Sequence, residues 1–117
     1  MKIGFIGLGN VGGKLARSLL RNNFDLTVRD LDGSLTKTFK DLGATVSNSA
    51  KELTEKVDLI ITSLPSPKVS AEVMEAEDGI LNGLSQNKIW LEMSTTDEAE
   101  VKRLGEKVIA KKAIPLD

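Results

Sequence analysis

The residues whose types and spacing suggest chemistry lie at the start of the chain, in a glycine-rich turn. A strand pattern over residues 2–7 leads to Gly7, Gly9 and Gly12. In such a pattern the first glycine permits a tight turn, the second lets the backbone approach a pyrophosphate, and the third lets a helix pack close to the strand. The helix that follows would present free N–H groups to the negative charge. We therefore predict a dinucleotide-binding turn, against the alternative of a tight turn without a ligand.

An acidic residue follows this turn at a suitable distance. Asp30 ends a second strand pattern, close to the spacing of about 20 residues that the acid of a dinucleotide site has. A carboxylate there can accept hydrogen bonds from an adenosine ribose and would repel a 2′-phosphate, so Asp30 favours NAD, with NADP as the alternative. Arg29 complicates this preference, because strand alternation directs it away from Asp30 but its side chain is long. Asp30 could also simply form the turn before Leu31.

Composition excludes several kinds of site. The chain has 117 residues, enough for one domain with a core, and its net charge of −1 and few aromatic residues give no footprint for nucleic acid or an anionic membrane. Its apolar runs are too short to span a bilayer. Without Cys, His or Tyr, it has no thiolate nucleophile, zinc cluster or common general base, so redox chemistry would depend on a cofactor. The absence of Cys agrees with a cytoplasmic location, which we predict.

Strand and helix patterns alternate along the whole chain, which predicts an α/β fold with helices on both faces of a parallel sheet. Ser34 is a candidate N-cap for the second helix, and Thr96 or Asp97 for the last. We expect a doubly wound sheet of six strands in the order 3-2-1-4-5-6, with a ligand across the carboxyl ends of the first and fourth strands. The six strand patterns cover residues 2–7, 25–30, 44–46, 57–62, 88–91 and 112–116.

The segment after the fourth strand pattern has two prolines. Pro65 and Pro67 predict a rigid loop there, because proline interrupts both helices and strand ladders. The hydroxyls of Thr62 and Ser63 could cap the next helix or contact a ligand, and both interpretations stay open.

Residues 2–12, 59–65 and 91–97, in this order and spacing, resemble the β-hydroxyacid dehydrogenases, which include 3-hydroxyisobutyrate dehydrogenase and tartronate semialdehyde reductase. The resemblance extends over residues 1–117. Members of that family have an N-terminal Rossmann domain followed by an all-helical substrate domain with a catalytic lysine. The resemblance implies that this chain corresponds to the NAD(P)-binding Rossmann domain alone, with the helical domain absent. It also implies an NAD(P)-dependent oxidoreductase that acts on a small β-hydroxy acid or semialdehyde.

The resemblance also implies which residues bind the cofactor. The turn would bind pyrophosphate, the Leu-Pro step would pack along the cofactor, and Thr95 would lie near the nicotinamide. The chain departs from the family pattern at Val11, usually Met, at Glu92, usually Asp, and at Val69, where some members have Asn. The cofactor-binding positions that we expect are Gly7, Leu8, Gly9, Asn10, Val11, Gly12, Asp30, Leu64, Pro65 and Thr95.

No catalytic residue and no metal ligand is assigned within this chain, so we expect it to be inactive alone. The expected partners are a nicotinamide dinucleotide and, in a full-length protein, a small hydroxy acid. We expect no nucleic acid or membrane partner, and a homo-oligomer is left open. A stand-alone NAD(H)-binding regulatory module is the alternative function. A methyltransferase-like adenosyl site is disfavoured, because the glycine turn suits a pyrophosphate.

Overall fold

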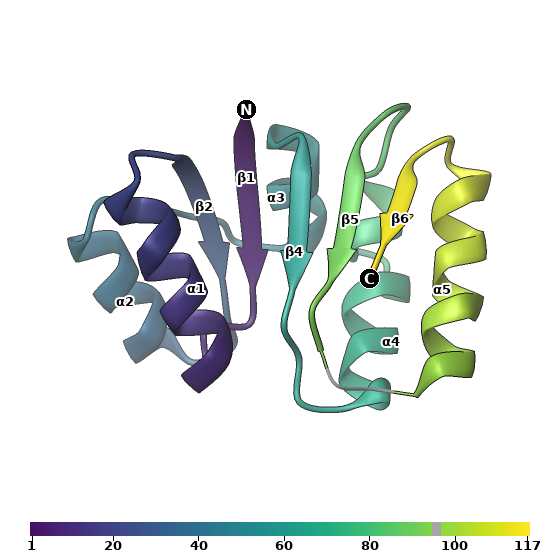
Figure 1. Ribbon diagram of the computed structural model, residues 1–117, viewed down its shortest axis with the longest axis horizontal. Coiled ribbons are helices and arrows are strands. Elements are labelled where there is room, and N and C mark those ends of the chain that lie inside the picture. The colour runs from purple at the N-terminus through teal and green to yellow at the C-terminus, as the bar shows by residue number, and fades with distance from the viewer. Residues whose placement is uncertain (95–96) are drawn as a thin grey trace.

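The computed structural model of the chain describes residues 1–94 and 97–117, and at its centre lies one sheet of six strands (Figure 1). The strand order is β3-β2-β1-β4-β5-β6, and neighbouring strands run parallel, which confirms the predicted order. The strands are β1 (Lys2–Ile6), β2 (Asp25–Arg29), β3 (Thr45–Val46), β4 (Leu59–Thr62), β5 (Ile89–Glu92) and β6 (Ile114–Leu116).

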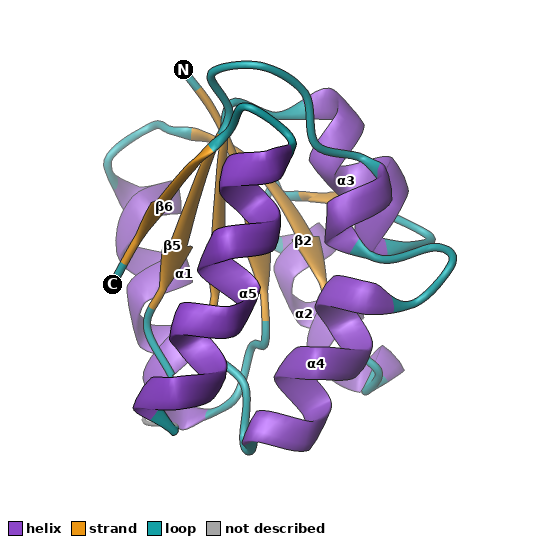
Figure 2. Cartoon of the chain, turned by 90° about the vertical axis from the view of Figure 1, so that its right-hand side faces the viewer, coloured by secondary structure: helices purple, strands orange, loops and turns teal. Residues whose placement is uncertain are grey.

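Helices connect these strands and cover both faces of the sheet, as the view from the β6 edge shows (Figure 2). Within the part of the chain that the structure describes, none of them is long and apolar enough to cross a membrane. The helices are α1 (Asn10–Arg21), α2 (Gly33–Asp41), α3 (Ala50–Lys56), α4 (Pro67–Glu75) and α5 (Glu98–Ala110), with a short 3₁₀ helix at Ile80–Asn82.

Two hydrophobic cores lie on opposite faces of the sheet, because side chains alternate along each strand. Phe5 of β1 belongs to the core beneath α1 and α2, whereas Ile6, the next residue, belongs to the core beneath α3, α4 and α5. In β4, Ile60 and Ile61 divide between the cores in the same way. The central strands β1 and β4 are therefore buried on both faces, which explains why they are mostly apolar.

The helix starts correct some of the predicted caps. The N-cap of α2 is Asp32, not Ser34, and its carboxylate accepts a hydrogen bond from the Ser34 N–H at 2.9 Å. Ser66 caps α4, and Pro67 is the first residue of that helix, so the second proline begins a helix where we expected only a loop. Proline suits this position because its missing N–H needs no helical partner. Asp97 caps α5, as one of our two alternatives proposed; the other, Thr96, lies outside the described residues.

An ion-pair cluster joins α4 to α5. The carboxylate of Glu75 accepts hydrogen bonds from the Arg103 guanidinium and from Nζ of Lys107, and Glu100 binds the same Arg103. The hydrogen bond from Arg103, followed by that from Lys107, lowers the pKa of Glu75 from its usual 4.5 to about 2. Folding therefore favours the charged form of Glu75.

We predict that this cluster makes the stability of the chain fall as the pH drops from 4.5 to about 2. Because the pKa of Glu75 is lower in the folded state, its stabilising effect is complete above pH 4.5 and is lost as the pH falls towards about 2. Glu75→Gln should lower the melting temperature at pH 7 by a few degrees, with a diminishing difference from wild type at acid pH. Thermal unfolding followed by circular dichroism measures this. A difference that stays constant from pH 7 to pH 2 would contradict it.

Candidate functional site

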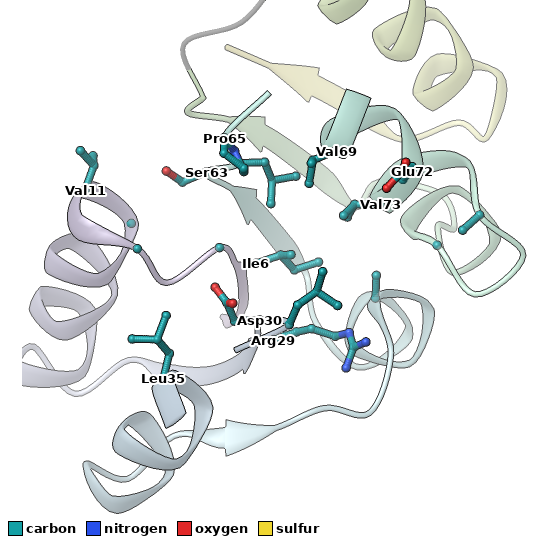
Figure 3. A pocket seen from close by; sticks show the side chains of 18 of the residues that line it. Ile6, Val11, Arg29, Asp30, Leu35, Ser63, Pro65, Val69, Glu72 and Val73 are labelled. Atoms are coloured by element: carbon teal, nitrogen blue, oxygen red, sulfur yellow. The ribbon is translucent and has the colours of Figure 1, made fainter. Parts of the chain in front are cut away.

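A cavity of about 680 Å³ opens at the carboxyl edge of the sheet, above β1 and its neighbours β2 and β4 (Figure 3). The chain leaves β1 towards β2 on one side, and β4 lies on the other, so the strand order reverses at this point. In open α/β sheets such a crevice is the usual place for a ligand. It is lined by Ile6, Gly7, Gly9, Asn10, Val11, Gly12, Arg29, Asp30, Leu31, Leu35, Ala50, Ser63, Leu64, Pro65, Val69, Glu72, Val73, Ala76, Asp78 and Gly79.

The glycine turn packs against the segment that follows β4. Gly7 has a φ of +100°, and a Cβ on it would lie 2.0 Å from the carbonyl oxygen of Ser63. A Cβ on Gly12 would lie 2.1 Å from the carbonyl oxygen of Gly7. Both positions therefore require glycine for steric reasons, which agrees with the tight turn and close helix packing that the sequence predicts.

Gly9 differs from Gly7 and Gly12 because, apart from its chain neighbours and the adjacent helix backbone, no described residue lies within 4 Å of where its Cβ would be. It is the N-cap of α1, with no side-chain cap and no acidic residue in the first turn of the helix. The first backbone N–H groups of a helix have no partner within it, and they carry the positive end of the helix dipole. The open space at Gly9 therefore adjoins donors that suit a phosphate.

Asp30 is tied to the glycine turn. Its Oδ2 accepts a hydrogen bond from the Leu8 N–H at 2.7 Å, and its Oδ1 accepts one from the Asp32 N–H at 2.8 Å. The bond to the Asp32 N–H, two residues along the chain, forms the turn that the sequence offered as the alternative for Asp30, whereas the bond to the Leu8 N–H was not predicted. Each carboxylate oxygen can accept a further hydrogen bond, so Asp30 can still bind hydroxyls. The Arg29 side chain leads away from it, as strand alternation predicts, and its Nη1 lies 3.5 Å from the Ser47 carbonyl oxygen (Figure 3).

The structure brings most of the predicted residues together around this cavity. Leu8 is an exception, because its side chain is buried in the core beneath α1 and α2, with 2% of its surface exposed. Only its backbone takes part, through the N–H that donates a hydrogen bond to Asp30. Thr95 lies outside the described residues. The predicted residues that line the cavity are Gly7, Gly9, Asn10, Val11, Gly12, Asp30, Leu64 and Pro65.

One wall of the cavity was identified from the sequence only at Val69, a position where some members of the family that the chain resembles have Asn. It is formed by α4, whose Val69, Glu72 and Val73 face Leu35 and Arg29 across the cavity (Figure 3). The spacing of Val69 and Val73 resembles that of an ordinary core stripe, and this spacing alone does not distinguish a cavity wall from core. A flat apolar group could bind between these walls, with the phosphate donors of α1 beside it.

Thr62 and Ser63 also have defined places. Thr62 does not cap α4; its buried hydroxyl accepts from the Trp90 indole N–H at 3.0 Å and donates to Glu92 at 3.2 Å. Ser63 lines the cavity, while Ser66 provides the cap. The hydroxyls of Thr62 and Ser63, whose roles the sequence did not decide, therefore have different surroundings.

The doubly wound sheet, the glycine turn and the cavity above them define a dinucleotide-binding domain. Residues 2–117 match the family described as the NAD binding domain of 6-phosphogluconate dehydrogenase. The chain belongs to this family, as a domain of the kind found in 3-hydroxyisobutyrate dehydrogenase-like oxidoreductases.

Individual relatives agree with this assignment. The chain is 36% identical over 115 residues to mitochondrial 3-hydroxyisobutyrate dehydrogenase of Mus musculus, a match that covers 98% of the chain and 34% of that enzyme. The chain thus spans about a third of the length of this curated relative. Two solved structures share its fold. Psf3 in complex with NADP+ has a TM-score of 0.91 at 22% identity, covering 97% of this chain and 40% of that one. A variant of the imine reductase from Myxococcus stipitatus in complex with NAD+ has a TM-score of 0.88 at 16% identity, and the match covers 97% of this chain and 38% of that one.

We predict that Gly9→Ala folds normally but binds NAD+ poorly. The protein has room for the methyl group at a φ of −67°, so the clash would be with a phosphate that approaches the turn. The affinity should fall by about 5- to 150-fold, the equivalent of roughly 1–3 kcal/mol. Isothermal titration calorimetry gives the dissociation constant, and circular dichroism verifies the fold.

Gly33→Ala is a matched control, because a Cβ there also meets no described residue beyond its own surroundings in the chain within 4 Å, and Gly33 is not among the residues that line the cavity. Its affinity should equal that of wild type. Unchanged binding by Gly9→Ala would show that the phosphate does not approach this turn.

Proposed function

We propose that the chain binds NAD(H) in the cavity above the glycine turn, as the cofactor domain of an oxidoreductase that acts on a small β-hydroxy acid or semialdehyde. The observation that carries the proposal is the unobstructed N-terminus of α1 at Gly9, at the point where the strand order reverses. The 3-hydroxyisobutyrate dehydrogenase name of the mouse relative supports the reaction class. Binding of NAD+ measured by calorimetry tests the proposal directly.

In this proposal, each part of the cavity binds one part of the cofactor. The N–H groups of α1 and the backbone at Gly9 bind the pyrophosphate, and Asp30 binds the adenosine ribose. Leu64 and Pro65 line the cavity beside the turn and would pack along the cofactor. Thr95 is proposed near the nicotinamide from the family resemblance alone. The nicotinamide ring supplies the hydride transfer, and the protein supplies binding and orientation.

The preference for NAD over NADP is proposed from Asp30. Its two hydrogen bonds to backbone N–H groups hold the carboxylate in place, so it cannot easily move aside for a 2′-phosphate. The structures that share this fold contain NADP+ in one case and NAD+ in another, so the fold alone does not decide. Leu31 lines the same cavity with 90% of its surface exposed, which leaves the rim without a cation at that position.

We predict that the double variant Asp30→Asn, Leu31→Arg raises the ratio of NADP affinity to NAD affinity. The change removes the repulsion and adds a guanidinium that can bind a 2′-phosphate. Because Leu31 is exposed, the arginine should not disturb packing. Calorimetric titration with both cofactors measures the ratio.

Each single variant serves as a control that separates the two effects. Leu31→Arg should raise NADP affinity alone, whereas Asp30→Asn should also weaken the contact with the Leu8 N–H. If the ratio stays unchanged or falls in the double variant, another residue recognises the ribose, and Arg29 is the first to test.

The alternative of a stand-alone NAD(H)-binding module predicts the same binding but no reaction in any context. The cavity itself offers little for proton transfer. Among its described lining residues are no Lys, His, Tyr or Cys, and the acids are Asp30, Glu72 and Asp78. We propose that the base for the hydroxy acid belongs to a helical domain of the kind found in the family. A longer protein with such a domain would support the enzyme over the module.

We predict that the 117-residue chain binds NAD+ but does not oxidise hydroxy acids. A proton must leave the substrate hydroxyl as the hydride departs, and no positioned base is assigned in the chain. The measurement is NADH absorbance with 3-hydroxyisobutyrate, glycerate and 4-hydroxybutyrate at high protein concentration. Turnover that co-purifies with the chain would refute this prediction and direct the search for a base to Glu92, Asp97 and Lys68.

A further inference from the structure

Glu92, the last residue of β5, is a carboxylate buried beside the cavity. Only 5% of its surface is exposed, and it lies opposite Thr62 in the β4–β5 register. Its Oε2 accepts a hydrogen bond from the Thr62 hydroxyl at 3.2 Å, and its Oε1 accepts one from the Ser94 N–H. Burying a carboxylate is costly unless its oxygens have partners, and both oxygens of Glu92 have one.

The hydrogen bonds continue on both sides of Glu92. Towards the core, the Thr62 hydroxyl accepts from the indole N–H of Trp90, which is itself 1% exposed. Towards the surface, the Ser94 hydroxyl accepts from the Leu64 N–H at 2.6 Å. The chain of contacts therefore runs from Trp90 through Thr62, Glu92 and Ser94 to Leu64, and it crosses repeatedly between β4 and β5 with their following segments.

The segment held at the end of this chain is a wall of the cavity. Ser63, Leu64 and Pro65 all line it. The Ser63 carbonyl oxygen occupies the space where a Cβ on Gly7 would lie. The Cβ of Ser63 lies 3.1 Å from where a Cβ on Gly12 would be. A displacement of Leu64 would therefore also displace the neighbour that packs against the glycine turn.

We infer that Glu92 is a positioning residue for the cofactor: it holds the Ser63–Pro65 segment against the glycine turn, although its own side chain does not line the cavity. The inference rests on the proposed function. Stability alone would not require a carboxylate here, because an apolar residue of similar size often stabilises a buried site equally well. A fully satisfied polar network instead selects one arrangement of the two segments. The glutamate side chain connects the Thr62 hydroxyl of one strand end with the Ser94 amide of the next.

The test compares Glu92→Leu with Glu92→Gln. Leucine removes both acceptors at similar size, whereas glutamine can accept from the Ser94 N–H and donate to the Thr62 hydroxyl. NAD+ affinity is measured by calorimetry well below the melting temperature of each variant, so that loss of stability alone does not affect it. We expect Glu92→Leu to weaken binding by about tenfold, as for one hydrogen bond to a charged group, and Glu92→Gln to stay near wild type.

Two further variants keep the result interpretable. Ser94→Ala removes the acceptor of the Leu64 N–H without leaving a buried charge, and it should weaken NAD+ binding even if Glu92→Leu does not fold. Val108→Ala is the control for stability, because Val108 is fully buried in α5 and does not line the cavity. It should lower the melting temperature and leave the affinity unchanged.

The outcomes separate this inference from the proposed function. If wild type binds NAD+ and both Ser94→Ala and any folded Glu92→Leu bind equally well, the positioning role is refuted while the proposed function stands. Equal losses of NAD+ affinity in Val108→Ala and Ser94→Ala would also refute the positioning role, since the effect would then not depend on the contacts of Glu92 and Ser94. If wild type binds neither NAD+ nor NADP+, the proposed function fails, and the inference fails with it.

Discussion

The site depends on three backbone segments that approach more closely than side chains would allow. The turn after β1, the start of α1 and the segment after β4 meet at Gly7, Gly12 and Ser63, where a single added methyl group would lie about 2 Å from a carbonyl oxygen. The cavity, the exposed N-terminus of α1 and the position of Asp30 all follow from this contact. The remainder of the fold, with one core on each face of the sheet, holds these segments from both sides.

Two sets of hydrogen bonds hold the backbone segments that meet at Gly7, Gly12 and Ser63. On the β2 side, Asp30 binds the Leu8 N–H of the turn. On the β5 side, Glu92 and Ser94 hold Leu64 of the segment after β4. Both carboxylates lie at strand ends and bind backbone N–H groups, and such charge-assisted hydrogen bonds are the stronger kind. The opening between them is therefore bordered by two segments whose backbone N–H groups are held by side chains.

The sequence predicted the fold and the turn well, because both depend on local patterns. Alternating strand and helix periods give the sheet order, and glycine spacing gives the shape of the turn. The features of the site that the sequence did not predict depend on contacts between segments far apart in the chain. The bond from the Leu8 N–H to Asp30 could be seen only once the two segments were placed side by side. Of the α4 wall, only Val69 was indicated, by the family resemblance, because the helical spacing of Val69 and Val73 is also that of a core stripe. The shift of the cap from Ser34 to Asp32 has a local cause, since two suitable residues stand two positions apart and backbone geometry selects one.

The two bonds that Asp30 makes to the backbone have a consequence for how cofactor choice can change over evolution. A residue that only recognised the ribose could be exchanged freely, but exchanging Asp30 also loosens the turn to which it is bound. If Asp30 selects the cofactor as proposed, cofactor choice and the integrity of the turn are linked at one residue. A lineage that acquires a new cofactor preference meets less resistance at the exposed Leu31, where a basic residue can be gained first and the acid lost afterwards. The order of substitutions along such a path would be constrained by the hydrogen bond from the Leu8 N–H to Asp30.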